Sequence, residues 1–353
     1  MHKVRLTDIF EDELVEILRP LGVEKYRARQ ILEWVYARGA KDFGKMTNLP
    51  KTLREQLSQH LRFTNIRTMA RQNSEQDGTL KFLFEFEDGH AVESVLLRHD
   101  YGNSVCVSTQ VGCSRGCRFC ASTLEGLIRN LSAGEIIEQV LALEAVLADE
   151  HQHVSSIVIM GAGEPLDNYD QVLRFIRLLH LPYGLNIGYR NITLSTCGVV
   201  PGIDRLAQEG LPITLSVSLH APNDRLRSEL MPINERYPIA ELLAACDCYA
   251  AITKRRITYE YALVSQVNDR AEDARQLANL LAGRLCHVNL IPVNAVSEHS
   301  YHQPPTETIR RFQDILKLRG IEATIRKEMG SDIDAACGQL RRRIIKEKTE
   351  DIF

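Results

Sequence analysis

Hydrophobic and polar positions follow two different periods along this chain. Residues 1–62 follow the helical period. Within Glu24–Arg38 the apolar positions with helical spacing are Ala28, Ile31, Leu32 and Val35. Gly39 follows as a stop signal, and Thr52-Leu-Arg-Glu55 has the form of a capping box that opens a third helix. The pattern therefore predicts a small helical accessory domain over residues 1–63.

Residues 64–98 change to the period of β-strands. Leu80–Glu87 and Ala91–Arg98 are rich in β-forming residues and flank Asp88-Gly89, which is a turn signal. We expect a β-hairpin here that links the helical domain to the segment that follows.

From residue 104 onward, strand patterns alternate with helical ones. The predicted strands are Val105–Thr109, Ser155–Met160, Asn191–Ser195, Thr214–Ser218, Ile257–Leu263, His287–Ile291 and Glu322–Arg326. Ser132-Ala-Gly-Glu135 has capping-box form and opens one of the helices between them. This alternation predicts an α/β fold with a parallel sheet. Six main repeats are too few for an eight-stranded barrel and fit an open, partial (β/α)6 barrel over residues 99–340, with 341–353 as a tail.

The composition is that of an ordinary globular chain of 353 residues, with 44% hydrophobic and 25% charged residues. There is no run of eighteen apolar residues, and the first residues carry no signal-peptide pattern. We therefore expect no transmembrane span and a cytoplasmic location. The nine cysteines are an odd number, and three of them are clustered, which indicates a reducing compartment and metal or catalytic use.

The net charge of −3 gives no support for a nucleic-acid partner. Any RNA binding must therefore come from local basic groups. The candidates are Arg115 and Arg118, Lys254-Arg255-Arg256, and Arg341-Arg342-Arg343. A solvated surface is the commoner explanation for each of them.

Three cysteines, Cys113, Cys117 and Cys120, lie in a loop that follows the predicted strand Val105–Thr109. Such a loop can bring three thiolates to one metal centre. A closed zinc site needs four protein ligands, and no fourth Cys or His follows within the next thirty residues. Three thiolates on a four-iron cube leave one iron open to a substrate. A zinc loop with a distant fourth ligand is the alternative.

Polar residues follow the predicted strands at the end where parallel barrels carry their active sites. Gly161-Ala-Gly163-Glu164-Pro165 comes first; its glycines can let the backbone approach a ligand, and Glu164 can accept from a ligand ammonium. A tight turn explains the same pattern. The later segments are Ser195-Thr-Cys-Gly198, Ser218-Leu219-His220, Pro222-Asn223-Asp224 and Pro292-Val293-Asn294. Each alone could simply cap a helix, but together they favour a ligand across the barrel mouth.

Two further cysteines are separate from the cluster. Cys106 lies in the predicted strand seven residues before Cys113, and Cys337 lies near the C-terminus, in Asp334-Ala-Ala-Cys337-Gly-Gln-Leu340. A lone cysteine is usually a small buried hydrophobe. That is our expectation for the remaining four: Cys197, Cys246, Cys248 and Cys286.

The spacing Cys113-x3-Cys117-x-Phe-Cys120 after a strand resembles the signature of radical S-adenosylmethionine (SAM) enzymes. The resemblance implies a partial (β/α)6 barrel in which these cysteines hold a 4Fe-4S cluster, with SAM chelating its free iron. It also implies that Gly163 and Glu164 bind the SAM amino group, although Ala162 stands where close relatives usually have Met. The other implied SAM contacts are Ser195, Ser218, Leu219, His220 and Asn294.

A narrower resemblance runs over nearly the whole chain. Cys106-Val-Ser-Thr-Gln-Val-Gly-Cys113 and the segment around Cys337 resemble the radical-SAM RNA adenine methyltransferases. Further matching segments are Val92-Glu93-Ser94-Val95, Arg129-Asn130-Leu131, Met231-Pro-Ile-Asn234 and His287-Val-Asn-Leu-Ile-Pro-Val-Asn294.

In that family the chemistry is radical because the adenine carbon is electrophilic and cannot attack a sulfonium methyl. The resemblance implies that Cys337 takes a methyl group from one SAM, and that a second SAM yields the radical that activates this methyl for addition to adenine. Cys106 then attacks Cys337, forming a transient disulfide, and Glu93 accepts the ring proton. For an attacking thiolate near a cationic or iron centre we expect a lowered pKa.

Pro292-Val293-Asn294 and Glu164-Pro165-Leu166 resemble the branch of the family that acts at adenine carbon 2. The implied substrates are an adenosine in the peptidyl-transferase centre of 23S rRNA and the adenosine 3′ of the anticodon in tRNA. The implied partner is a one-electron donor such as flavodoxin, and we expect a monomer. The alternatives are a carbon-8 methyltransferase of the Cfr type that confers antibiotic resistance, a radical-SAM enzyme with a small-molecule substrate, and a noncatalytic RNA-binding zinc protein.

Overall fold

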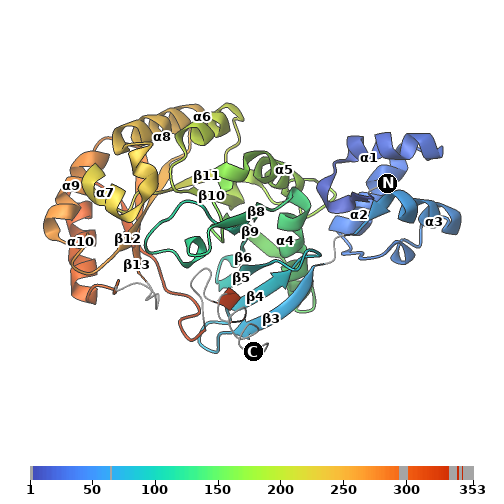
Figure 1. Cartoon of the computed structure of the whole chain (residues 1–353), viewed down its shortest axis with the longest axis horizontal. Helices are drawn as coiled ribbons and strands as arrows, with labels where there is room; N and C mark the ends of the chain where they lie inside the picture. Colours follow the sequence, from blue (N-terminus) through green and yellow to red (C-terminus); the bar gives the residue numbers. More distant parts are fainter. Residues whose placement is uncertain (1–2, 64–65, 294–300, 334–339, 342–343, 345–353) are drawn as a thin grey trace.

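The computed structural model describes residues 3–63, 66–293, 301–333, 340–341 and 344. A ten-stranded sheet dominates it, and a small helical domain stands at one end (Figure 1). In the described part of the chain, no helix is both long and apolar enough to cross a membrane. Our division of the chain at residues 63, 98 and 340 stays a prediction.

The N-terminal domain contains the helices α1 (Glu11–Leu18), α2 (Tyr26–Tyr36) and α3 (Lys51–His60). Its two ends meet, because β1 (Val4–Arg5) pairs in parallel with β2 (Leu61–Arg62). Three of the four predicted apolar positions, Ala28, Ile31 and Leu32, are fully buried, and Val35 is 2% exposed. The predicted capping box at Thr52 is wrong: α3 begins after Pro50, whose ring fixes a backbone angle suited to a helix start, and no side chain caps it.

Seven strands of the large sheet run parallel, as the alternation predicted. They are β6 (Gly102–Cys106), β9 (Val154–Ile159), β10 (Ile192–Thr196), β11 (Thr214–Ser218), β12 (Ile257–Leu263), β13 (Cys286–Pro292) and β14 (Ala323–Ile325). The outer helices form an arc along them (Figure 1). These helices are α4 (Ala133–Ala148), α5 (Tyr169–Leu179), α6 (Val200–Gln208), α7 (Asp224–Leu230), α8 (Ile239–Thr253), α9 (Ala271–Leu281) and α10 (Thr306–Leu318).

The predicted strand Val105–Thr109 is divided in the structure. The strand β6 ends at Cys106, and a separate strand β7 (Gln110–Gly112) pairs with β8 (Leu127–Asn130). The break occurs because the side-chain amide of Gln139 bonds the backbone of Ser108 on both sides, at 3.0 Å to its N–H and 3.0 Å to its carbonyl. A side chain from α4 thus takes the place of a neighbouring strand.

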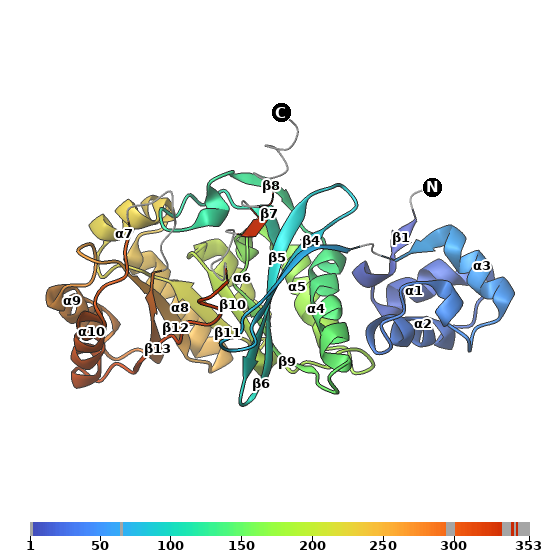
Figure 2. The same cartoon turned by 90° about the horizontal axis from the view of Figure 1, so that it is seen from below.

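The predicted hairpin is present and also extends the main sheet. The strands β4 (Leu80–Glu85) and β5 (Ala91–His99) pair antiparallel around Gly89, whose φ of 81° suits glycine. With β3 (Arg67–Asn73) they continue the sheet beyond β6 as an antiparallel wing (Figure 2). The segment expected as a linker is therefore part of the central sheet.

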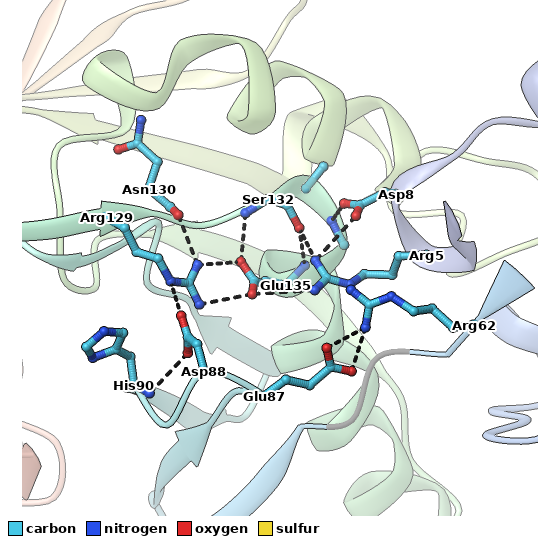
Figure 3. Close-up of polar contacts among 12 residues, drawn as sticks. Arg5, Asp8, Arg62, Glu87, Asp88, His90, Arg129, Asn130, Ser132 and Glu135 are labelled. Atoms are coloured by element: carbon cyan, nitrogen blue, oxygen red, sulfur yellow. Dashed lines mark hydrogen bonds and ion pairs between the residues drawn. The ribbon is translucent and has the colours of Figure 1, made fainter. Parts of the chain in front are cut away.

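Polar contacts join the N-terminal domain to the start of α4 (Figure 3). The predicted capping box is confirmed, since Ser132 and Glu135 exchange hydrogen bonds at the helix start. Arg5 donates to the Ser132 hydroxyl at 2.7 Å, and Asp8 accepts from the Gly134 N–H. Side chains of the accessory domain thus satisfy donors and acceptors at the N-terminus of a barrel helix.

The same junction includes the tip of the hairpin (Figure 3). Arg129 of β8 bonds both oxygens of Glu135, at 2.8 and 3.0 Å, and also pairs with Asp88. Arg62 pairs with Glu87 across the gap between the domain and the hairpin. Accessory domain, hairpin and barrel therefore meet at one network of charges.

Candidate active site

A cavity of about 310 Å³ opens at the carboxyl ends of the parallel strands. Its walls come from the loop after β7 and from the ends of β9, β10, β11, β12 and β13. This is the location expected for the active site of a parallel barrel.

The three predicted metal ligands line this cavity together: Cys113, Cys117 and Cys120. Cys113 follows Gly112, where a side chain would lie 2.0 Å from the Gly126 carbonyl oxygen, so only glycine permits this turn. Burial raises the pKa of the Cys113 thiol to about 11, and the pKa of the Cys117 thiol higher still. Free thiolates are therefore unfavourable here, and a bound cationic metal centre is what would deprotonate them. Three soft thiol ligands at the wall of a cavity fit an iron–sulfur group.

Glu164 also lines the cavity and is 3% exposed. One carboxylate oxygen accepts from the Leu166 N–H at 3.0 Å and the Thr196 hydroxyl at 2.8 Å, and the other accepts from the Cys197 N–H at 2.7 Å. Three donors fix the carboxylate but leave one of its four acceptor positions. The residue can therefore accept a further hydrogen bond from a ligand.

The two glycines beside Glu164 serve a different contact from the one expected. A side chain at Gly161 would lie 2.5 Å from the Val107 carbonyl oxygen, and one at Gly163 would lie 2.7 Å from the Gln110 side chain. Both glycines border the cavity, but the close approach that requires them is to the chain segment after β6. The expectation that they serve approach to a ligand needs this correction.

The strand-end residues are partly brought together. Ser195, Ser218 and His220 line the cavity, whereas Leu219 is fully buried in the core and is absent from the lining. The side chains at 218 and 220 line the cavity while that at 219 packs in the core, although β11 ends at Ser218 and His220 has a φ of 56°. Asn223 caps α7 by accepting from the Leu226 N–H, which is the simpler alternative considered for this segment. Asn294 lies outside the described residues.

His220 is held in one orientation. Its Nδ1 accepts the Ala262 N–H at 2.9 Å, and its ring meets Phe119 edge-on at 4.7 Å between centroids. Burial lowers the pKa of His220 to about 3. The ring is therefore neutral at physiological pH, and the bond to Nδ1 leaves its proton on Nε2.

The predicted proton acceptor Glu93 is buried in β5 and is not an exposed hairpin carboxylate. It is 7% exposed, its Oε2 lies 3.0 Å from the Lys81 ammonium, and its Oε1 accepts from the Arg341 N–H at 2.7 Å. Lys81 itself is 0% exposed. The carboxylate is thus oriented by a buried ion pair and by the backbone of the C-terminal segment.

Cys106 lies on the same face of the sheet as Glu93. It ends β6 and stands opposite Val95, two residues along β5 from Glu93, so the side chains project to one side. Burial raises the pKa of the Cys106 thiol, and the charges of Arg326 and Lys81 oppose this rise without overcoming it. The lowered pKa that we expect for an attacking thiolate near a cationic or iron centre therefore stays a prediction.

The C-terminal segment packs against this face. Leu340 is fully buried with Leu83 and Ala91, and Arg341 pairs through its guanidinium with Glu125 at 2.7 Å. Cys337, which precedes Leu340 by three residues, lies outside the described residues.

The other four cysteines differ in their burial. Cys246 is a core residue and Cys286 is half-buried, but Cys248 is exposed on α8, contrary to expectation, and Cys197 borders the cavity.

Among the basic groups, Lys254-Arg255-Arg256 precedes β12 and so lies at the opposite end of the barrel from the cavity. Arg115 lines the cavity and pairs with Asp167.

Sequence reasoning missed several polar residues of the site: Lys81, Thr196, Glu260 and Arg326. Glu260 and Arg326 line the cavity, and Glu260 is 4% exposed, bonded to Ser216 and Asn289. Lys81 carried a usable signal, because it is the one charged residue among the apolar positions of the predicted strand start Leu80–Phe84. The others look like ordinary strand or helix-start residues until the sheet is assembled.

Comparison with known proteins places these observations in a family. A family model described as "Radical SAM superfamily" matches residues 107–280, and one described as "Ribosomal RNA large subunit methyltransferase N-terminal domain" matches residues 4–62. A curated protein of Desulforamulus reducens named "Probable dual-specificity RNA methyltransferase RlmN" is 55% identical, with 97% of each chain covered. One of the same name from Geobacillus kaustophilus is 54% identical, covering 96% of this chain and 92% of its own.

A solved structure agrees with this result. The crystal structure of a radical SAM methyltransferase from Sphaerobacter thermophilus has a TM-score of 0.92 and 49% identity, and the match covers 95% of this chain and 98% of the other. The predicted α/β fold with a radical-SAM barrel and a small N-terminal domain is confirmed. As a radical SAM protein the chain uses a 4Fe-4S cluster and SAM. The cysteine triplet that lines the cavity, the 55% identity over 97% of the chain and the shared fold together show that this chain belongs to the RlmN family of radical-SAM-dependent RNA methyltransferases.

Proposed function

We propose that this protein methylates carbon 2 of an adenosine in the peptidyl-transferase centre of 23S rRNA and of the adenosine 3′ of the anticodon in tRNA. The observation that carries the proposal is the shared sheet face of Glu93 and Cys106. Arg326 of the cavity wall acts on the charge of Cys106, which links this face to the cavity that Cys113, Cys117 and Cys120 line in a chain of the RlmN family. A small-molecule radical-SAM enzyme or an RNA-binding zinc protein would not need this second pair of groups.

The cluster site is proposed to consist of Cys113, Cys117 and Cys120. When bound, the cluster and SAM supply a carbon radical that can act on an unreactive aromatic carbon. Within the described residues, no three Cys, His, Asp or Glu side chains converge closely enough to hold a single metal ion. The three thiols that line one cavity would hold an iron–sulfur cluster, which takes thiolate ligands.

SAM is proposed to lie in the cavity, with two molecules used in each turnover. Glu164 offers its remaining acceptor position to the amino group, and Gly163 borders the same place. Ser195, Ser218 and the Nε2–H of His220 offer hydroxyl and N–H groups to the ribose and carboxylate. Leu219 can contribute only through its backbone, because its side chain lies in the core. Asn294 completes the proposed set from outside the described residues.

Transfer to RNA is proposed to use Cys337, Glu93 and Cys106. Cys337 carries the methyl group to adenine, and Glu93 accepts the ring proton. Cys106 attacks the sulfur of Cys337, so that the disulfide forms as the bond from that sulfur to the transferred carbon breaks and the carbon takes up a proton. Two features support these roles. Glu93 is oriented by Lys81 and the Arg341 N–H, and Leu340 anchors the chain just after Cys337 on the same face.

Carbon 2 is favoured over carbon 8 because the relatives at 54–55% identity all carry the dual-specificity RlmN name. The carbon-8 enzyme of the Cfr type is therefore not favoured. We further propose a cytoplasmic monomer that receives its electrons from a one-electron donor such as flavodoxin.

The experiment that tests this function compares RNA from a strain lacking the gene with RNA from the complemented strain. Mass spectrometry of digested 23S rRNA and tRNA should show 2-methyladenosine only when the gene is present. Finding 8-methyladenosine instead would show that the protein methylates carbon 8. An unchanged nucleoside profile would reject RNA methylation.

A further inference from the structure

Arg227 of α7 is a fully buried guanidinium, 0% exposed. Its Nη1 donates to the Asn234 side-chain oxygen at 2.9 Å and the Tyr237 carbonyl at 3.4 Å. Its Nη2 donates to the carbonyls of Cys197 at 2.7 Å and Ser218 at 3.2 Å. All four acceptors are neutral, and the Nε atom has no partner in the described part of the chain. The positive charge is therefore buried without a carboxylate among its hydrogen-bond acceptors.

An isolated buried charge is costly, because the protein interior replaces only part of the solvation that water provides. Arginine does not escape this cost by losing its proton, since its guanidinium stays charged in proteins. After burial itself, the strongest influences on Arg227 are the thiols of Cys197 and Cys117, both of which line the cavity. The charge is thus placed beside a site where negative charge would stabilise it.

Arg227 also connects the parts that surround the cavity. The carbonyls it holds belong to Cys197, just past β10, and to Ser218, the last residue of β11. Its own helix is tied to the cysteine loop, because the Arg118 N–H donates to the Leu230 carbonyl at 3.0 Å. A side chain at Gly198 would lie 3.0 Å from Nη2, so the strand end packs directly on the guanidinium. Arg227 therefore braces two SAM-facing strand ends against the cysteine loop.

We propose that Arg227 is a positioning residue whose buried charge also raises the reduction potential of the cluster held by Cys113, Cys117 and Cys120. This inference rests on the proposed function, which supplies the cluster. One-electron reduction by a low-potential carrier protein adds one negative charge to the buried site and changes no covalent bond. The guanidinium donates hydrogen bonds only to neutral acceptors, and Asp224 acts on it less strongly than the two cavity thiols, so the fixed cation stabilises this added charge.

The test uses the full chain, reconstituted anaerobically, in four forms: wild type, Arg227→Met, Arg227→Lys and Arg255→Met. Met keeps much of the side-chain volume without charge, and Lys keeps the charge without the fork that bridges two carbonyls. Arg255 is the matched control, because it is partly buried, bonds Thr214 at the far end of β11 and also has an unpartnered Nε. Iron and sulfide content, the midpoint potential from a dithionite titration, and SAM affinity by equilibrium dialysis are measured.

In Arg227→Met we expect a normal cluster content and a more negative midpoint potential. In Arg227→Lys we expect a near-normal potential and about tenfold weaker SAM binding, because one or two charge-assisted hydrogen bonds are lost. Arg255→Met should match the wild type. An unchanged potential in Arg227→Met would overturn the electrostatic role. If that variant does not fold, a potential in Arg227→Lys shifted below the wild type would overturn it instead. A wild-type protein that assembles no cluster would reject the proposed function itself, which is a distinct result.

Discussion

The cysteine side of the site, which lines the cavity, and the hairpin side, which is the sheet face of Glu93 and Cys106, hold their functional groups by different physical means. On the cysteine side, the three thiols sit on the loop after β7, and Glu164, just past β9, is fixed by three neutral donors. On the hairpin side, Glu93 is fixed by a buried ion pair to Lys81, and Cys106 lies between charges of both signs. The first side fixes its carboxylate with neutral hydrogen-bond donors, whereas the second balances charges around the two groups that we propose exchange protons.

The family matches divide along the same line. The superfamily match covers residues 107–280, which include the cysteine loop and the ends of β9, β10 and β11. Glu93 and Cys106 lie outside it and also outside the match to residues 4–62. The comparison teaches that the part of the chain shared with the radical SAM superfamily is joined to the face proposed to act on RNA by a sheet that continues through β5, β4 and β3.

The cysteine side should fail completely when one ligand is removed. We expect Cys113→Ala, Cys117→Ala and Cys120→Ala each to abolish cluster assembly and methylation, because a three-ligand site has no spare thiolate. Iron and sulfide analysis after anaerobic reconstitution measures this. Cys248→Ala, on the exposed surface of α8, is the matched control and should keep its cluster. A complete cluster that cleaves SAM in any of the three variants would refute the ligand assignment.

On the hairpin side, loss of the buried ion pair should lower the stability of the folded protein. Lys81→Met leaves the Glu93 carboxylate buried without its cation, which should lower the free energy of unfolding by about 3–5 kcal/mol. Chemical denaturation of the cluster-free protein measures this. The double variant Lys81→Met/Glu93→Leu should recover much of the loss, whereas Arg256→Met, which breaks an exposed pair with Glu322, should cost less than about 1 kcal/mol. Equal losses for Lys81→Met and Arg256→Met would show that the buried pair is not special.

The pH dependence of the last step, in which Cys106 attacks the sulfur of Cys337, should distinguish the hairpin side from the cysteine side. Burial raises the pKa of Cys106, so its thiol is protonated at neutral pH and the reactive thiolate grows as pH rises. We expect the rate of adduct resolution to increase about tenfold for each pH unit until the thiol pKa is reached. Rapid-quench analysis of a preformed protein–RNA adduct measures that rate. A plateau already present at pH 7 would contradict a protonated thiol.

A smaller effect should come from Arg326, whose charge favours the Cys106 thiolate. Arg326→Met should slow the same step a few-fold at neutral pH, and higher pH should restore the rate because it supplies the thiolate directly. Arg319→Met, at the end of α10 away from the cavity, is the control and should leave the rate unchanged. A loss that persists at high pH would mean that Arg326 acts on RNA binding instead of on the thiol.

The cysteine side could be predicted from the sequence largely because its residues are contiguous. Cys113, Cys117 and Cys120 share one loop, and Glu164, Ser195 and Ser218 each follow a recognisable strand. The local surroundings were not predictable. The side chain of Leu219 packs in the core and leaves only its backbone for a ligand, and the glycines at 161 and 163 also lie against the segment after β6.

The hairpin side could be predicted from the sequence only in part. Glu93 and Cys106 came from a family resemblance, since a lone cysteine or glutamate in a strand carries no signal of its own. Lys81 pairs with Glu93 only because the register places Leu83 opposite Glu93 and Lys81 one side-chain step away. The charges that set the pKa of Cys106 come from residues more than two hundred positions apart, Lys81 and Arg326, which no local pattern brings together.

The most direct test of the account is a single turnover of Cys106→Ala with a tRNA substrate, followed on a denaturing gel. We predict a covalent protein–RNA adduct that nuclease trims and that peptide mass spectrometry locates on Cys337, because the bond to Cys337 has formed and no thiolate resolves it. The Cys106→Ala/Cys337→Ala double variant should give no adduct. Normal multiple turnover by Cys106→Ala, with methylated RNA and no adduct, would contradict the proposed role of Cys106 in releasing the RNA from Cys337.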